Sequence, residues 1–217
     1  AGSKQIALVI SQAWNRDGQK ISQTYPDGNT STFTYDKEQL KTASQPGSTN
    51  EINWSSYEWS LPKEIFYPGA KRINVYDGFY RYKNIDVKSV AAAPVSILNL
   101  GYQYDLDSNI TKIQRHVGQN MQGITVYGYE SLDRLTQAMP SQSLKDLGLP
   151  VEKYTYDPVH NRKSSAHQPA EWIFKIGNRL SQWGEEQSQI IYEYGDSGNI
   201  IKEVNANADL ARTYEYD

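Results

Sequence analysis

Tyrosine pairs separated by one residue recur along this chain, and this repeat constrains the fold more than any other feature. An acidic residue follows most copies, and a Ser-Asn, Asp-Arg, His-Asn or Gly-Asn pair comes a few residues later. Such self-similarity predicts supersecondary units that stack on one another. The complete pairs are Tyr102/Tyr104, Tyr127/Tyr129, Tyr154/Tyr156, Tyr192/Tyr194 and Tyr214/Tyr216, and "FTYD" at residues 33–36 is a near copy.

Weaker copies fill the gaps between the complete ones. In three of them Trp14, Trp59 and Phe174 take the position of the second ring. The second rings then follow one another at intervals of about 22 residues, within the range of known repeat architectures. The resulting series is Trp14, Tyr35, Trp59, Tyr76, Tyr104, Tyr129, Tyr156, Phe174, Tyr194 and Tyr216.

Each copy has the pattern of a β-hairpin. Residues i and i+2 of a strand share a face, so both rings of a pair project to one side and the mostly polar middle residue projects to the other. The acid that follows suits the first position of a type I turn. The next turn position suits a positive φ, and β-branched or apolar residues then open the return strand.

The sequence therefore predicts an all-β fold: about ten antiparallel hairpins in a curved, spiralling sheet. Residues 1–9 are predicted as a cloning scar and lead-in strand. Residues 10–217 are predicted as the repeat array, a fragment of a longer protein whose last repeat is cut off. We expect the second rings Tyr104, Tyr129, Tyr156 and Tyr194 to lie inside, with Trp14, Trp59 and Phe174 as their equivalents. Residues 143–148 could form a short helix ended by Gly148, within a loop insertion.

Composition supports a packing role for the rings. The chain has 17 Tyr against 4 Phe, and tyrosine suits sites where an apolar ring packs while its hydroxyl reaches a partner or water. A net charge of −3 without a basic block gives little support for nucleic-acid binding. The longest apolar run, "IALVI", is too short to span a membrane. The absence of cysteine excludes thiol chemistry and disulfides in this chain.

Catalytic and metal sites find no support in the sequence. His160, His167 and Asp157 match no standard ligand spacing, so turn or surface roles are favoured over a metal site. "DLDSN" at residues 105–109 resembles part of a calcium loop but lacks its later Gly and Glu. No Gly-x-Ser-x-Gly nucleophile motif is present. We therefore predict no catalytic residue, no metal and no cofactor.

The motif itself resembles a known family. Tyr-x-Tyr-Asp-x-x-Gly-Asn/Arg-Ile/Leu-Thr, with "YPDG" before some copies, is similar to the YD repeat of rearrangement hotspot (Rhs) proteins, and residues 102–111 and 127–136 match it almost letter for letter. That resemblance implies hairpins wound into a hollow shell, which in bacterial members such as the Tc toxin B and C subunits encloses a toxic C-terminal polypeptide. It implies a structural container without catalysis. The residues assigned to the structural repeat are Tyr35, Asp36, Tyr76, Asp77, Tyr102, Tyr104, Asp105, Tyr127, Tyr129, Tyr154, Tyr156, Asp157, Tyr192, Tyr194 and Gly198.

This chain departs from the family pattern at two places. The self-cleavage motif with paired Asp-Pro-x-Gly is absent, because Asp157-Pro158 is followed by Val159-His160. Toxicity and autoproteolysis are therefore not assigned to this chain. Glycine is also missing from the turn in five units, where the expected turn residues are Ser108, Asp133, His160, Lys63 and Tyr80.

Partners follow from the resemblance and from the size of the array. About 20 strands at about 4.8 Å spacing give a sheet about 95 Å wide, too small to close around a folded toxin. The expected partners are adjacent repeats of a longer parent and an enclosed C-terminal polypeptide, with self-association through sheet edges as a further route. The expected location is secreted or on a bacterial cell surface.

A carbohydrate- or cell-surface-binding repeat module is the alternative function. Exposed Trp and Tyr beside Asn and Asp can stack on sugar rings, whereas buried rings would instead form the core of the stack. Exposure of the rings therefore separates the two functions. The sugar-stacking candidates are Trp54, Trp59, Trp172 and Trp183.

Overall fold

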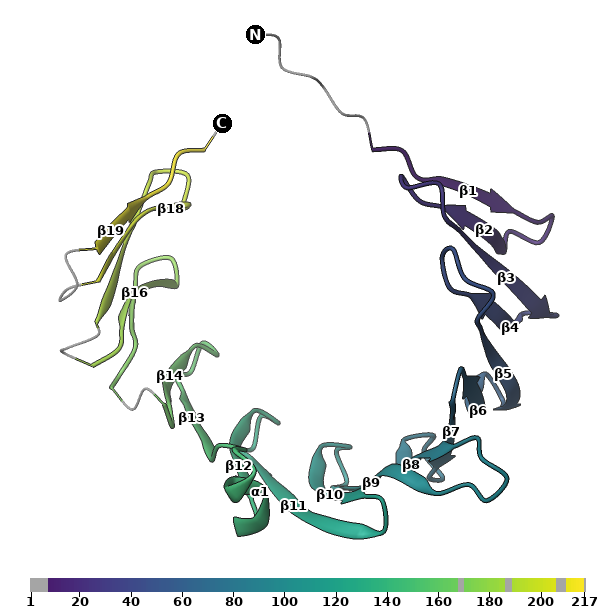
Figure 1. The fold of residues 1–217 in the computed structure, drawn as a ribbon. Helices are drawn as coiled ribbons and strands as arrows, with labels where there is room; N and C mark the ends of the chain where they lie inside the picture. The colour runs from purple at the N-terminus through teal and green to yellow at the C-terminus, as the bar shows by residue number, and fades with distance from the viewer. Residues whose placement is uncertain (1–7, 168–169, 186–188, 206–209, 217) are drawn as a thin grey trace, which may run out of the picture. The chain divides into compact units, whose positions relative to one another are not determined.

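The computed structural model describes residues 8–167, 170–185, 189–205 and 210–216, which form antiparallel strands and one short helix (Figure 1). The elements are β1 Ser11–Trp14, β2 Lys20–Thr24, β3 Thr30–Asp36, β4 Gln39–Ser44, β5 Glu51–Glu58, β6 Leu61–Tyr67, β7 Ala70–Tyr76, β8 Tyr82–Ser89, β9 Ser96–Tyr104, β10 Ile110–Val117, β11 Asn120–Tyr129, β12 Leu135–Pro140, α1 Gln142–Asp146, β13 Glu152–Tyr156, β14 Arg162–Ser165, β15 Ile173–Lys175, β16 Arg179–Trp183, β17 Ile190–Tyr194, β18 Ile200–Asn205 and β19 Leu210–Thr213.

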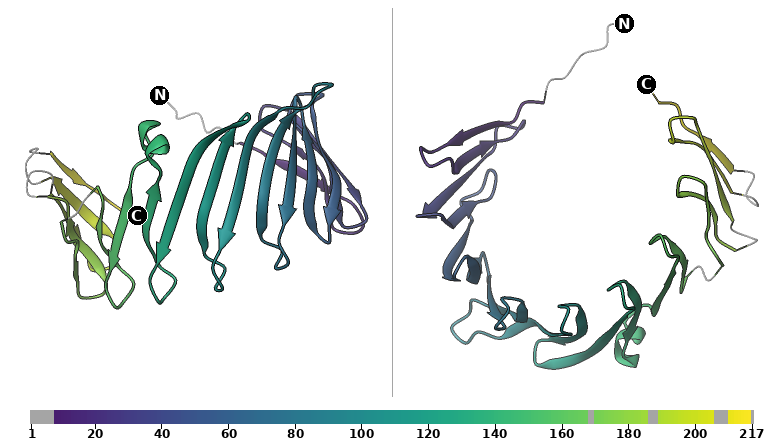
Figure 2. Two further views of the ribbon diagram at one scale, coloured as in Figure 1. Left: turned by 90° about the horizontal axis from the view of Figure 1, so that it is seen from below. Right: turned by 180° about the vertical axis from the view of Figure 1, so that it is seen from behind.

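Strand order follows chain order throughout. One sheet runs from β1 to β14 and a second from β15 to β19, and in each sheet neighbours in sequence are neighbours in space. The chain divides into two compact units, residues 1–102 with 114–122 and residues 103–113 with 123–217. Within each unit the strands lie side by side (Figure 2). The predicted all-β array of antiparallel hairpins is confirmed.

Acidic and amide side chains build the turns at the hairpin tips. In the turn that starts at Asp105, the Asp105 N–H donates to the Asn109 carbonyl and the Ser108 N–H donates to the Asp105 carbonyl. The Asp105 carboxylate accepts the backbone N–H groups of Asp107 and Asn109 at 3.0 and 2.8 Å. The same pair of side-chain bonds recurs at Asn15, Asp77 and Asp157.

One residue in each of these turns takes a left-handed conformation, as the sequence predicts. Four of the five non-glycine positions behave as expected, with positive φ at Ser108, Asp133, His160 and Tyr80. The fifth expectation, Lys63, is wrong because Lys63 lies in strand β6. Two-residue loops replace the longer turn at two tips, where Asp36 pairs with Gln39 and Glu58 pairs with Leu61. Their left-handed residues are Lys37 and Trp59.

Two glycines allow the energetic cost of the left-handed conformation to be measured separately from steric clashes. Gly18 has a φ of +76°, Gly78 does not have a positive φ, and an added Cβ would meet nothing within 4 Å at either site. We expect Gly18→Ala to lower the free energy of unfolding by about 1 kcal/mol, because only the backbone strain differs. Gly78→Ala is the matched control and should leave stability unchanged or slightly raised. Urea unfolding of both variants checks this, and equal losses would contradict the assignment of strain to Gly18.

Burial is modest because the main contacts of each strand are with its neighbours in the sheet. The rings Tyr104, Tyr129, Tyr156 and Tyr194 are half-buried, less than predicted, and Phe174 is also half-buried. The predictions for Trp14 and Trp59 are wrong, since their exposures are 57% and 77%. Trp14 lies on the first strand of the sheet, and Trp59 lies in a turn. The most buried hydrophobic residues are Ala43, Ile65, Tyr76 and Leu144.

The short helix forms where the sequence predicts it. Helix α1 ends near Gly148, whose φ is +89°, and its Leu144 is the most buried apolar residue described. Residues 90–95 form an exposed loop between β8 and β9. Residues 1–7 of the predicted lead-in lie outside the described part of the chain, and residues 8–10 form no strand.

Candidate functional site: two hydrogen-bond ladders between the hairpins

A tyrosine hydroxyl bonds to the preceding hairpin in seven of the repeats. Tyr129 donates to the Ile110 carbonyl at 2.9 Å, and Tyr156 donates to the Leu135 carbonyl at 2.7 Å. The donor follows its acceptor by 14 to 21 residues in every case. The remaining donors and acceptors are Tyr35 to Lys20, Tyr57 to Leu40, Tyr76 to Pro62, Tyr194 to Leu180 and Tyr216 to Ile200. We call this series the phenol ladder.

The acceptor in each rung has a constant place in its hairpin. The acceptor is the residue that pairs across its own hairpin with the second aromatic ring, next to an irregularity in strand register. For example, Tyr35 pairs with Leu40, and the Leu40 carbonyl accepts a hydrogen bond from the Tyr57 hydroxyl. Likewise, Tyr129 pairs with Leu135, and Leu135 accepts from Tyr156. Because a bulge disrupts the strand ladder locally, the next hairpin's phenol completes the hydrogen bonding there.

This geometry explains why the chain uses tyrosine and not phenylalanine. Phenylalanine could pack on the neighbouring hairpin, but it has no hydroxyl to donate to the carbonyl. Phe174 is the one second ring of this kind among the described strands, and it lies on β15, where a new sheet begins after β14. By the rule above, its acceptor would be Arg162, which pairs with Tyr156.

A second ladder runs along the hairpin tips in the opposite direction. The polar residue that closes one turn donates a hydrogen bond to the next turn. The acceptor there is the left-handed residue or another residue of the same turn. Gln19 and Gln39 reach the carbonyls of Lys37 and Trp59, both at 2.6 Å. The other rungs are Asn109 to the Asp133 carboxylate, Arg134 to the Asp157 carbonyl and Asn161 to the Asn178 side chain. We call this series the tip ladder.

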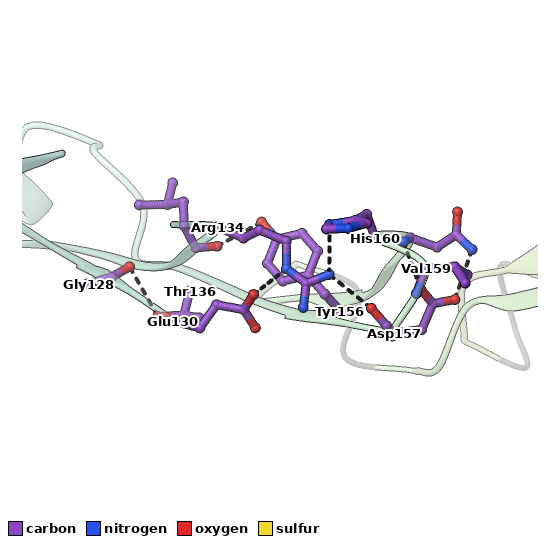
Figure 3. Close-up of polar contacts among 10 residues, drawn as sticks. Gly128, Glu130, Arg134, Thr136, Tyr156, Asp157, Val159 and His160 are labelled. Carbon is purple, nitrogen blue, oxygen red and sulfur yellow. Dashed lines mark hydrogen bonds and ion pairs between the residues drawn. The ribbon is translucent and has the colours of Figure 1, made fainter. Parts of the chain in front are cut away.

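Arg134 is the most connected residue of the tip ladder (Figure 3). It forms an ion pair with Glu130 in its own turn and reaches the Asp157 carbonyl and His160 Nδ1 in the next, at 2.9 and 3.4 Å. Its guanidinium also lies 4.7 Å from the ring centre of Tyr156. The Arg134 hydrogen bond holds the pKa of Glu130 below its usual value, and that bond in turn raises the pKa of Arg134. One side chain therefore joins both ladders.

Two turn carboxylates, those of Asp77 and Asp157, have a lowered pKa that favours their charged form. Burial acts to raise the pKa of Asp157, but hydrogen bonds from the Asn161 side chain and from the backbone N–H groups outweigh it, so this pKa lies below its usual value. Asp77 shows the same balance, with Arg81 as the main donor. These acids stabilise the fold above their unfolded pKa, and that stability is lost as the pH falls through the folded values.

The phenol ladder has the opposite dependence on pH. Burial, with a smaller contribution from Tyr82, raises the pKa of Tyr76 to about 12. Burial also raises the pKa of Tyr57, Tyr129 and Tyr194. A raised pKa means that the neutral phenol stabilises the fold, so this stability is present below about pH 10 and is lost as the pH rises toward 12.

An alkaline titration checks this dependence. We expect the ultraviolet absorbance of phenolate to show a group of tyrosines that ionise only as the fold melts, above the range of exposed tyrosines. Tyr76→Phe should remove one late-ionising group. If all tyrosines ionised together near the ordinary value without loss of structure, the ladder hydroxyls would not be donors.

The repeat residues named from the sequence occupy equivalent places in most units. The first rings Tyr102, Tyr127, Tyr154 and Tyr192 are half-buried beside the second rings. Asp77, Asp105 and Asp157 cap turns, and Gly198 has a positive φ. Asp36 is different, because its two-residue loop leaves no turn of this type to cap. In the next unit along the chain, the second ring is Tyr57 and not Trp59, because the Tyr57 hydroxyl forms the phenol-ladder hydrogen bond to Leu40.

The four tryptophan candidates fall into two groups. Trp172 and Trp183 pack together with ring centres 5.8 Å apart, and Trp183 donates to the Tyr192 hydroxyl. Trp54 is half-buried and lines a concave surface together with the exposed Trp59. The sequence does not show which tryptophans pack against each other and which line the concave surface.

Neither a metal centre nor a membrane helix appears in the described part of the chain. Within those residues no cluster of three or more His, Asp or Glu side chains could hold a metal ion. The helix found there, α1, is five residues long, and none is long and apolar enough to cross a membrane.

Comparison with known proteins supports the fold through structure and not through sequence. The sequence matches no protein-family model and no curated protein. The fold is similar to a chain of the Tc holotoxin pore of Photorhabdus luminescens, solved in a mutant form, with a TM-score of 0.56 and 16% identity. The alignment covers 94% of this chain and 14% of that one. This likeness shows a β-sheet fold of the kind found in Tc toxins.

A second solved structure is more distant. A porin-like protein from Bacteroides uniformis aligns with a TM-score of 0.43 and 10% identity, over 93% of this chain and 91% of that one. A likeness at this level supports no statement about the present fold.

Proposed function

We propose that this chain is a non-catalytic structural module, a wall section of an Rhs-type β-shell that encloses or presents a C-terminal toxin. The observation that carries the proposal is the pair of ladders, in which the recurring tyrosines and turn residues of one hairpin bond to the neighbouring hairpin. A recurring motif that joins repeat to repeat in this way suits a wall. The fold likeness to a Tc holotoxin chain, over most of this sequence, supports the same function.

The proposal includes membership of the YD-repeat family and a longer parent protein. The partners are then adjacent repeats of the parent and an enclosed polypeptide, and the location is secreted or on a bacterial cell surface. Self-association through open sheet edges is a further proposed property, because β1 and β19 each pair with a single neighbour among the described strands.

Protease protection in the longer parent tests the proposal. The parent would be produced whole and treated with protease, and the survival of its C-terminal polypeptide would be followed by mass spectrometry. We expect that polypeptide to resist digestion until the shell is opened with denaturant. A parent carrying Tyr→Phe changes at several rungs should lose this protection at a lower denaturant concentration. Equal digestion of the C-terminal polypeptide inside and outside the parent would refute enclosure.

A further inference from the structure

Trp59 is a large side chain at a turn position that favours a small residue. It is the first residue of a two-residue loop, with a φ of +58° and 77% exposure. A bulky residue in the left-handed region is a strained outlier, and glycine or asparagine would fill this turn at lower cost. The exposed ring also gains little from burial. Strain that the fold does not need points to a function for the side chain.

Two more exposed aromatic rings lie on the next hairpin tip. Tyr80 also has a positive φ, of +61°, and its ring meets that of Trp59 edge to face at 6.3 Å. Phe79 is 78% exposed, with the Arg81 guanidinium 5.0 Å from its ring centre. We call Trp59, Phe79 and Tyr80 the aromatic tip cluster. Two of its three members occupy left-handed turn positions that glycine or asparagine would fill with less strain, so turn formation does not explain why aromatic residues stand there.

A concave surface adjoins the Trp59 face of the cluster. Two overlapping hollows of about 510 and 720 Å³ share Trp54, Tyr57 and Trp59 as aromatic lining. Both volumes lie in the range of small-molecule sites. The charged and amide groups on this surface are the carboxylates of Asp36 and Glu38, the amides of Gln39 and Asn53, and the ammonium of Lys41, and serine hydroxyls also line it.

These groups favour an uncharged ligand that has one apolar face and many hydroxyls. Flat indole rings offer an electron-rich face to polarised C–H bonds, and carboxylates and amides accept and donate hydrogen bonds to hydroxyls. Two carboxylates against one ammonium do not favour a polyanion such as a nucleic acid. Gln39 donates its Nε2 to the Trp59 carbonyl, which fixes the amide and leaves its oxygen as an acceptor.

We propose that this surface binds the pyranose ring of a neutral carbohydrate. The apolar face of the sugar stacks on Trp59, Trp54 forms the floor, and the sugar hydroxyls bond to Asp36, Gln39 and Asn53. The site lies between the tips of the β3–β4 and β5–β6 hairpins, within one compact unit. Trp172 and Trp183 have no part in it, since they pack on each other and on Arg162 and Tyr192.

Saturation-transfer NMR on the whole chain tests the proposal with four neutral disaccharides: cellobiose, chitobiose, lactose and maltose. We expect saturation of at least one of them. Trp59→Gly removes the ring and relieves the strain, so it should reduce binding at least tenfold while thermal stability is retained or raised. Ile176→Ser, at an exposed tip residue of the other unit, is the control and should bind as the wild type does.

Two results would overturn the carbohydrate site. One is the absence of saturation transfer to all four disaccharides with the wild-type chain. The other is a Trp59→Gly variant that is folded and still binds with unchanged affinity. Neither result bears on the shell proposal, which depends on the ladders and not on the side chain of Trp59.

Discussion

Replacing Tyr156 by Phe is expected to lower the free energy of unfolding by about 1–2 kcal/mol, although the aromatic ring is retained. The change removes a 2.7 Å hydrogen bond and leaves the Leu135 carbonyl without its phenol donor beside a bulge. A lost bond to a partly buried carbonyl has this magnitude. Equilibrium unfolding in urea measures the loss.

Two control substitutions sharpen this prediction. Tyr67 is half-buried, and its hydroxyl makes no hydrogen bond among the described residues, so Tyr67→Phe should be close to neutral. Tyr76→Phe should cost less than Tyr156→Phe, because the Pro62 carbonyl keeps a second donor, Asn74 Nδ2, at 2.7 Å. If all three substitutions cost the same, the hydrogen bonds of the phenol ladder would not account for the losses.

Combining the changes should unfold the array. The rungs are one repeat apart and share no atoms, so their effects should add. Five Tyr→Phe substitutions would then remove about 5–10 kcal/mol, which is comparable to the whole stability of a typical domain. We expect loss of the β-sheet signal in circular dichroism at room temperature; retention of full structure would refute the ladder as the main contact between hairpins. The five positions are Tyr35, Tyr57, Tyr129, Tyr156 and Tyr194.

The second large effect is expected at Ile65. This side chain is 5% exposed and pairs across the sheet with Trp54 and Arg72. Ile65→Ala should lower the free energy of unfolding by about 2–4 kcal/mol, because it leaves a cavity on the face that carries the rings. The matched control is Ile97→Ala in the same unit, where the side chain is 46% exposed and the loss should be below about 1 kcal/mol. A similar loss at both sites in urea unfolding would show that the ring face is not the packed face.

Much of this architecture follows from the sequence, because it depends on local patterns. The Tyr-x-Tyr alternation fixes which face carries the rings, and Asp105 with Asn109 defines a turn whose chemistry is complete within five residues. Left-handed turn positions such as His160 are visible because they align with glycines in other copies. The short helix α1 is marked by Gly148.

The remaining features depend on register, which the sequence does not state. The segment "YEWSLPKEI" fits a two-residue loop and a five-residue turn equally well. The sequence pattern therefore predicts Trp59 as the second ring of this repeat, whereas in the structure that ring is Tyr57. The acceptors of the phenol ladder are backbone carbonyls, so no side-chain pattern in the sequence marks them. The forward contacts of Arg134 and Asn109 become visible only when neighbouring turns are seen together. The exposure of Trp14 follows from its place on the first strand.

Carbonyl NMR tests the central claim most directly. Three acceptors of the phenol ladder are leucines, Leu40, Leu135 and Leu180, so a sample with ¹³C-labelled leucine carbonyls reports three rungs at once. Each carbonyl signal should move when its own tyrosine, Tyr57, Tyr156 or Tyr194, is changed to Phe, and the other two signals should stay in place. If none of the three carbonyl chemical shifts changed in any of the variants, the claim that phenol hydroxyls join a hairpin to the one before it would be contradicted.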